Sequence, residues 1–441
     1  MSSYLEQFRR LIPQTLADDQ KQSAEHFTRT RKLSLPNLIT LVLSLVTSDK
    51  SAGMDIHSGE FFKQARRSGC WPEAEAVHRS AVTKARSRLP WSVFTDLLAD
   101  SVQLAYSLWP ESPEYTWHGM TAVAFDGSKY HLPASPELRQ AFDPNSGLTY
   151  PGKGHYPQCL VSTAFDVFRR LPIARAISPL AEGNEREDVK ELLPQLPDRP
   201  LVLLFDRGYP SYDLLYYLRD TSPDSAFVFR CPAQSTFKAV ENFVQSGRSE
   251  AVIWLDTASR IRRKRPGPKS IKLRAVRLES PDGTLSVLLT NLTDNRQYPA
   301  DSLVELYFRR WRIEEQYRDE KLHLDIETFH SHSENGIRQE LLAVLVMCVI
   351  SRTLIALLTD PDPERLSTPQ FKNAVRALAS EVVVFTAAYP EIARNVFQEL
   401  LVEITRVQYY HPKKPRKSHP RVSRKPINKW QQDKSKRIAD A

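Results

Sequence analysis

The first 115 residues show the hydrophobic periodicity of helices and almost no strand pattern. In SLPNLITLVLSLV, Ser34 fits a helix N-cap and Pro36 fits the first turn, ahead of an apolar face. The stretch HRSAVTKARSRLPWSVFTDLLADSVQLAYSLW predicts two helices separated near Pro90. We therefore expect a helical domain over residues 1–115.

Between residues 116 and 231, short apolar runs alternate with amphipathic segments. Strands are predicted at TAVAF, YPQCLVSTAFDVF, PIARAISPL, LVLLF and AFVFR, and helices at EREDVKELLPQL and SYDLLYYLRD. Three early strands followed by alternating helices and strands are typical of a mixed sheet in the α/β class. We expect residues 116–231 to form this core together with residues 301–358.

Residues 232–300 lose most of the helical pattern. EAVIWLDT, SIKLRAVRLE and TLSVLLTNL read as strands, which predicts a β-rich insertion within the core. Trp254 lies in a strand interior, where core packing is favoured over an exposed stacking role. The tract SRIRRKRPGPK predicts an arm that contacts DNA phosphates through four adjacent basic residues, Arg262, Arg263, Lys264 and Arg265.

A second basic group lies on the helix before Pro90 and contains Arg79, Lys84, Arg86 and Arg88. Small helical domains with a basic helix often bind DNA, which makes residues 1–115 a candidate for binding DNA ends. No clean helix-turn-helix pattern is present. A helical scaffold with a solvated basic face explains the same residues equally well.

The segment DSLVELYFRRWRIEEQYRDEKLHL contains no Pro or Gly and predicts one long helix. At about 100° per residue, four of its side chains fall within an arc of roughly 60°. They are Tyr307, Arg310, Glu314 and Lys321. A carboxylate flanked by basic groups suits a metal-bound phosphate. An ordinary charged face with pairs such as Arg310–Glu314 remains the alternative.

Two aspartates each follow an apolar run that reads as a strand. Asp126 closes TAVAFDGS and Asp206 closes LVLLFDRGY. Functional residues collect at the carboxyl ends of strands in α/β sheets, so both are site candidates. A turn-forming Asp is the alternative for either one alone.

These residues together resemble a known family. Asp126 in AFDGS, Asp206 in FDRGY and the spacing Y-x2-R-x3-E-x6-K from Tyr307 to Lys321 resemble the DDE transposases of bacterial insertion sequences, and within them the insertion-sequence-four family. The resemblance runs from about residue 120 to about residue 355. It implies a ribonuclease-H-like core interrupted by a β-rich insertion between the second Asp and the Glu.

The resemblance also implies a site and its partners. Asp126, Asp206 and Glu314 would be the catalytic residues and would hold two Mg²⁺ ions, for which Mn²⁺ can substitute. Tyr307, Arg310 and Lys321 would contact DNA phosphates. The implied activity is binding of terminal inverted repeats, cleavage of the element ends and joining of the 3′-hydroxyls to target DNA. Pairing two ends implies a homodimer on DNA.

Charge is concentrated at the end of the chain. Residues 406–441 contain twelve Lys or Arg and two Asp or Glu, whereas the whole chain carries +9. This tail is poor in apolar residues, so we expect it to be disordered when free. It reads as a DNA-backbone arm or, alternatively, as a solubilising tail. Residues 359–405, between the core and the tail, are expected to be helical.

The remaining patterns exclude several classes. The cysteines Cys70, Cys159, Cys231 and Cys348 have no CxxC spacing, which indicates a reducing compartment and no zinc site. AVLVMCVISRTLIALL is interrupted by Arg352 and predicts a core helix rather than a membrane span, and no signal peptide is expected. His323, His330 and His332 read as a polar loop. We expect a cytoplasmic protein associated with the nucleoid.

Two alternatives to a transposase remain open. A metal-dependent nuclease would use the same three carboxylates without joining DNA. A non-catalytic DNA-binding derivative would be expected to lose one of them. No phosphate-binding GxxxxGK[ST] loop occurs, which argues against a nucleotide-dependent enzyme.

Overall fold

The computed structural model describes residues 2–23, 33–47, 52–110, 112–144, 156–180, 183–234, 237–256, 269–279, 283–359 and 367–410. Arg262, Arg263, Lys264 and Arg265 lie outside these ranges, as does the tail beyond residue 410. The predictions for the basic arm and for most of the tail therefore stay predictions.

The described helices are α1 (Ser2–Ser23), α2 (Leu35–Ser44), α3 (Met54–Arg67), α4 (Arg79–Arg88), α5 (Ser92–Leu108), α6 (Pro136–Phe142), α7 (Glu185–Leu192), α8 (Tyr212–Thr221), α9 (Lys238–Gln245), α11 (Ala300–Arg309), α12 (Arg312–Arg318), α13 (Glu334–Leu357), α14 (Phe371–Glu381) and α15 (Pro390–Arg406). The strands are β1 (Thr121–His131), β2 (Gln158–Asp166), β3 (Leu171–Pro179), β4 (Leu201–Phe205), β5 (Ala226–Pro232), β6 (Glu250–Asp256), β7 (Ser270–Glu279), β8 (Leu285–Thr290), β9 (Ser367–Pro369) and β10 (Gln408–Tyr410).

Eight strands form one mixed sheet in the order β3-β2-β1-β4-β5-β8-β7-β6. β1, β4 and β5 are parallel, whereas β2 pairs antiparallel with β1, and β3 pairs antiparallel with β2. This confirms the predicted mixed α/β sheet. The strands of the insertion do not form a separate sheet, because β8 pairs with β5 and continues the core. The insertion also contains the helix α9, which was not among the predicted elements although Val240, Phe243 and Val244 have helical spacing.

The sheet is covered on both faces. Neighbouring residues of a strand point to opposite faces of the sheet. On β2, the neighbours Ser162 and Thr163 show which helices cover each face. Ser162 donates a hydrogen bond to Asp188 of α7 at 2.5 Å, whereas Thr163 accepts one from Arg175, whose guanidinium also binds the backbone of α13. α7 therefore covers one face, and α12 and α13 lie on the other.

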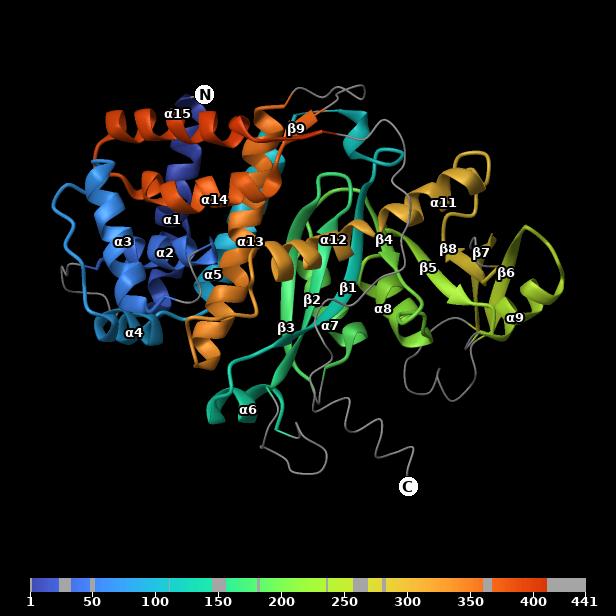
Figure 1. The fold of residues 1–441 in the computed structure, drawn as a ribbon. Helices are drawn as coiled ribbons and strands as arrows, with labels where there is room; N and C mark the ends of the chain where they lie inside the picture. The colour runs from blue at the N-terminus through green and yellow to red at the C-terminus, as the bar shows by residue number, and fades with distance from the viewer. Residues whose placement is uncertain are drawn as a thin grey trace.

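The helices at the start and the end of the chain pack together (Figure 1). The Phe8 ring lies 5.8 Å from the Phe385 ring, and the indole of Trp71 donates a hydrogen bond to the carbonyl of Thr386 at 2.9 Å. α13 runs between this helical layer and β3. Of the helices described, it alone is long and apolar enough to cross a membrane, but 89% of its most apolar window is buried in the protein. The prediction of a core helix agrees with this burial.

Two helix boundaries in the N-terminal region fall where the sequence predicts them. The Ser34 hydroxyl accepts a hydrogen bond from the backbone of Asn37, and α4 and α5 are separated at Pro90. One basic residue of α4 does not face solvent. Arg86 is buried and forms an ion pair with Glu340 of α13 at 2.9 Å, so its assignment to a DNA-binding face is wrong. Its guanidinium joins α4 to α13 instead.

Trp254 also departs from its prediction. It is 56% exposed on β6, the edge strand of the sheet, as is Val252 at 46%. The next residue, Leu255, is fully buried. An unbroken apolar run does not reveal which face of an edge strand is covered, which is why core packing was the wrong expectation.

Candidate active site

The two aspartates lie at the same level of adjacent parallel strands. In the pairing of β1 with β4, Ala124 lies beside Leu204. Asp126 comes two residues after Ala124, and Asp206 comes two residues after Leu204. β4 ends before Asp206, as predicted, but β1 continues to His131 because β2 still pairs with it. Asp126 therefore lies within its strand and does not close it. The Asp-Gly sequence is not a turn here.

The loop after β4 fixes Asp206. One carboxylate oxygen of Asp206 accepts a hydrogen bond from the backbone N–H of Gly208 at 2.7 Å. The carbonyl of Gly208 accepts two hydrogen bonds from the Arg186 guanidinium, at 2.9 and 2.8 Å. This arrangement docks the start of α7 onto the loop that carries the second aspartate.

The segment predicted as one helix is interrupted beside the site. α11 ends at Arg309 and α12 begins at Arg312. The N–H groups of Arg310 and Glu314 bond three residues back, as in a 3₁₀ turn. Residues Asp319–His323 then form a π-helix. The prediction of an uninterrupted helix is therefore wrong, and the four signature residues do not share one regular stripe.

Three of the four signature residues stay close to the aspartates. Tyr307 and Arg310 are 1% and 3% exposed, and the Arg310 guanidinium lies 3.6 Å from the Glu314 carboxylate. Burial raises the pKa of Asp126 to about 7; the cation of Arg310 opposes this rise, whereas the negative charges of Asp206, Glu185 and Glu314 add to it. The structure thus brings the three predicted carboxylates and Arg310 within electrostatic reach of one another.

Lys321 takes a different position. Its ammonium donates hydrogen bonds to the Ser128 hydroxyl at 2.9 Å and to the carbonyl of Lys129 at 2.6 Å, and it lies 4.4 Å from the centre of the Tyr130 ring. It therefore lies along β1 beyond Asp126, rather than beside Arg310. The irregular helix between Glu314 and Lys321 accounts for this separation.

A fourth carboxylate, which the sequence analysis missed, belongs to Glu185 at the start of α7. Gly127 pairs with Ser162, so both residues face the layer of α7. A side chain at Gly127 would overlap the Glu185 carboxyl group, with its Cβ only 2.7 Å from Cδ. Burial and the charge of Asp206 raise the pKa of Glu185. An acidic first turn of a helix is common, so nothing in the sequence around Glu185 indicates that it lies against the residue after Asp126.

The donor set fits hard cations such as Mg²⁺. Carboxylate oxygens are the ligands that such ions prefer. In the described ranges, no three His, Cys, Asp or Glu side chains are already gathered in a metal-binding arrangement. His323 and His330 instead pair with Asp319 at 3.1 Å and with Glu340 at 3.4 Å.

Buried donors face this group of carboxylates. Nε and Nη1 of Arg310 and the hydroxyl of Tyr307 are buried beside one another, and none of these atoms has a carboxylate or carbonyl oxygen as hydrogen-bond partner in the described part of the chain. Buried polar groups normally have partners, so these three donors suit an anionic ligand that completes the site. The arrangement can hold cations on its carboxylates and phosphate oxygens on its donors.

Comparison with known proteins finds similarity to transposases. The family model described as "Transposase DDE domain" matches residues 117–350, which is more than half of the chain. The chain is 28% identical over 274 residues to the transposase InsG for insertion sequence element IS4 of Escherichia coli K12, covering 61% of this chain and 59% of that protein. It is also 28% identical over 151 residues to y4zB of Sinorhizobium fredii, covering 34% and 41%. The chain therefore spans less than two thirds of these relatives.

A solved structure, that of the piggyBac transposase synaptic complex with hairpin DNA, is similar to 89% of this chain and to 78% of its own, at 12% identity and a TM-score of 0.40. Similarity at this level does not establish a shared fold. The strand order within the sheet carries the fold assignment instead.

Proposed function

Because the chain belongs to the transposase DDE domain family, we propose that it binds the terminal inverted repeats of an insertion sequence, cleaves the element ends and joins the 3′-hydroxyls to target DNA. The observation that carries the proposal is the register of β1 and β4, which sets Asp126 and Asp206 side by side opposite Arg310 and Glu314. DNA in the cytoplasm would be the partner, and a homodimer would pair the two ends.

In this proposal the carboxylates hold divalent cations. Asp126, Asp206 and Glu314 would hold two Mg²⁺ ions. The ions, when bound, would activate the attacking hydroxyl group and stabilise the charge that develops on the phosphate.

The remaining groups would position the DNA strand. Nε and Nη1 of Arg310 donate hydrogen bonds to phosphate oxygens, and the Tyr307 hydroxyl donates a further one. Lys321 holds the strand further along β1. The basic residues Arg262, Arg263, Lys264 and Arg265 would contact the backbone outside the site.

The test compares two adjacent glutamates. The chain is incubated with a duplex carrying the terminal sequence of its own element and with Mg²⁺ or Mn²⁺, and the cuts are mapped at nucleotide resolution. Glu314→Gln should abolish cleavage while DNA binding remains. Glu315→Gln is the control and should remain active, because Glu315 pairs with Arg170 and, unlike Glu314, is not among the charges that act on Asp126. Cleavage by Glu314→Gln at the wild-type rate would exclude the assigned site.

A second duplex in the same reaction separates the two enzymatic functions. Covalent joining of the cleaved 3′ end to that duplex supports a transposase. Cleavage without a joined product under any metal condition supports the nuclease on the same carboxylates.

A further inference from the structure

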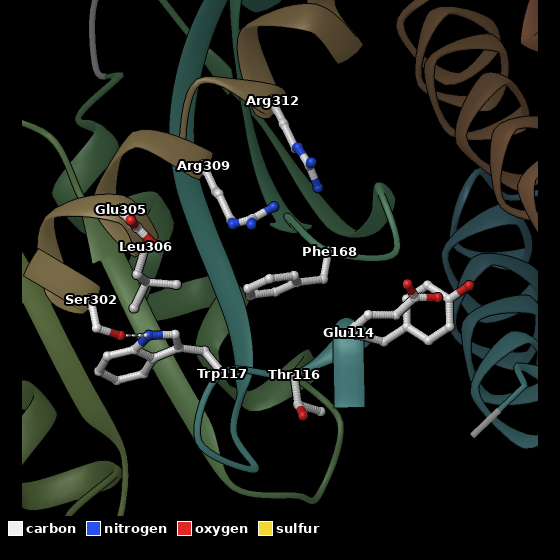
Figure 2. Close-up of a pocket in the computed structure, with 10 residues that line it drawn as sticks. Glu114, Thr116, Trp117, Phe168, Ser302, Glu305, Leu306, Arg309 and Arg312 are labelled. Atoms are coloured by element: carbon white, nitrogen blue, oxygen red, sulfur yellow. Dashed lines mark hydrogen bonds between the residues drawn. The ribbon is translucent and has the colours of Figure 1, made fainter. Parts of the chain in front are cut away.

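A cavity of about 630 Å³ lies beside the junction of α11 and α12, and none of the candidate active-site residues lines it (Figure 2). It is bounded by Trp117, which precedes β1, and by Phe168, which follows β2. Arg309 and Arg312 come from either side of the junction and point toward Phe168 (Figure 2). Arg310, between them, faces the carboxylates instead. Arg310 therefore borders the candidate active site, whereas Arg309 and Arg312 border this cavity.

The two arginines place two positive charges close together at the cavity. The Arg309 guanidinium lies 5.0 Å from the centre of the Phe168 ring and forms no ion pair with any described residue. Arg312 donates one hydrogen bond to the carbonyl of Val167 at 2.8 Å. Burial and the neighbouring cations Arg170 and Arg309 lower the pKa of Arg312 to about 10. A bound anion would relieve this repulsion.

The other residues that line the cavity suit a ligand that carries further groups besides a phosphate. The indole of Trp117 is fixed by a hydrogen bond to the Ser302 hydroxyl at 2.9 Å, and the Phe168 ring lies between Trp117 and the two arginines (Figure 2). Aromatic rings next to arginines are typical of sites that stack a nucleobase. The carboxylates of Glu114 and Glu305, which also line the cavity, can accept hydrogen bonds from the exocyclic amine of a base.

We propose that this cavity binds a nucleoside monophosphate unit, supplied by a free nucleotide or by an unpaired nucleotide of a DNA strand. Arg309 and Arg312 bind the phosphate, and the base packs on Phe168. The volume lies within the range of about 300–1,000 Å³ that is usual for small-molecule sites. Inorganic phosphate would leave the aromatic and acidic parts of the lining without a partner. The proposal does not depend on cleavage activity.

Calorimetric titration of the full chain tests it. Asp126→Asn protein in EDTA is used, so that neither cleavage nor bound metal contributes, and it is titrated with deoxycytidine monophosphate, with deoxycytidine and with inorganic phosphate. We expect saturable binding of the monophosphate, at least about tenfold tighter than either fragment. Arg309→Gln should weaken it about tenfold or more. Arg318 is an exposed arginine of the same segment and does not line the cavity. Arg318→Gln should therefore leave the binding of the monophosphate unchanged.

Photocrosslinking locates the ligand and identifies its source. A short single strand carrying 5-iodouracil is irradiated with the protein, and crosslinked peptides are identified by mass spectrometry. Crosslinks to the peptides of Phe168 or Trp117 that the Arg309→Gln substitution abolishes identify an unpaired DNA nucleotide. Saturable monophosphate binding without such crosslinks identifies a free nucleotide. The proposal is wrong if the monophosphate does not bind, if phosphate alone binds as tightly, or if Arg309→Gln and Arg318→Gln bind it equally.

Discussion

The Tyr317 hydroxyl donates a hydrogen bond to the backbone carbonyl of Asp126 at 2.7 Å. The carbonyl of Val161 on β2 lies 3.3 Å from the same hydroxyl. Tyr317 is three residues after Glu314 and only 6% exposed, so these contacts are shielded from water. The helix that carries the third carboxylate is thereby tied to the strand that carries the first, at the first aspartate itself.

Replacing Tyr317 by Phe should lower both stability and activity. The substitution leaves the carbonyl of Asp126 without this donor, which costs about 1–3 kcal/mol of unfolding free energy for a buried group. Because the register between α12 and β1 loosens, DNA cleavage should fall about tenfold or more at saturating metal. Urea unfolding and end-cleavage rates measure the two effects.

Tyr217→Phe is the matched control for that substitution. The Tyr217 hydroxyl also donates to a backbone carbonyl, that of Lys190, at 3.1 Å, but this bond joins α8 to α7 and involves neither β1 nor α12. It should lose stability without a comparable loss of cleavage rate. Equal losses of rate in the two variants would show that Tyr317 acts only through stability.

The π-helix holds a fully buried ion pair behind the site. The Arg175 guanidinium on β3 donates a hydrogen bond to Glu320 at 2.8 Å, and both side chains are 0% exposed. Tyr130 donates a hydrogen bond to the other carboxylate oxygen of Glu320 at 2.7 Å. A buried carboxylate without a cation is costly. The pairing with Arg175 therefore holds in place the π-helix that follows α12.

Arg175→Met should therefore destabilise the protein by about 3–5 kcal/mol, because Glu320 would remain buried without its partner. Adding Glu320→Gln to the same chain should recover a large part of this loss. Urea unfolding of the single and double variants measures both changes. A double variant less stable than Arg175→Met alone would contradict this account of the pair.

The elements of the sheet could be predicted from the sequence because each depends on a local pattern. The apolar runs that end at Phe125 and Phe205 form β1 and β4, and their rings stack at 5.0 Å. The aspartates that follow them were found for the same reason. The pattern could not predict where strand pairing ends. β2 pairs with β1 beyond Asp126, and no residue of β1 itself signals this.

Contacts between distant segments explain the other departures. No Pro or Gly marks the break at Arg310, where the buried guanidinium turns toward Asp126 and lies 5.5 Å from the centre of the exposed Trp311 ring. Glu185 reaches the site only because α7 packs on the face that Gly127 leaves open. A periodicity argument sees one segment at a time, so it predicts neither arrangement.

Glu185→Gln should weaken metal binding without unfolding the protein. Loss of this carboxylate removes one negative charge beside Asp126 and Asp206, and outer groups of metal sites commonly contribute about 10–100-fold in affinity. Titration with Mn²⁺, followed by electron paramagnetic resonance, measures the affinity. Glu187→Gln is the control, since Glu187 lies on the same helix and pairs with Lys190 at 2.7 Å. Equal affinities in the two variants would assign Glu185 a packing role.

The raised pKa of Asp126 predicts how stability depends on pH in the absence of metal. Its ordinary value is 3.8 and its value in the folded protein is about 7, so between these values the folded chain retains a proton that the unfolded chain releases. Stability must therefore decline as pH rises from about 4 to about 7, and it stays lower above that range. Asp126→Asn removes this dependence.

In EDTA at pH 8, Asp126→Asn should therefore be more stable than the wild type by about 2–4 kcal/mol, and the difference should nearly vanish near pH 4. Urea unfolding across this range measures it. Added Mg²⁺ should reverse the order at pH 8, because the cation stabilises the ionised wild-type site and finds fewer ligands in the variant. If the two proteins show parallel pH profiles in EDTA, the Asp126 carboxyl group is not buried among like charges, and the arrangement from which the site was assigned is incorrect.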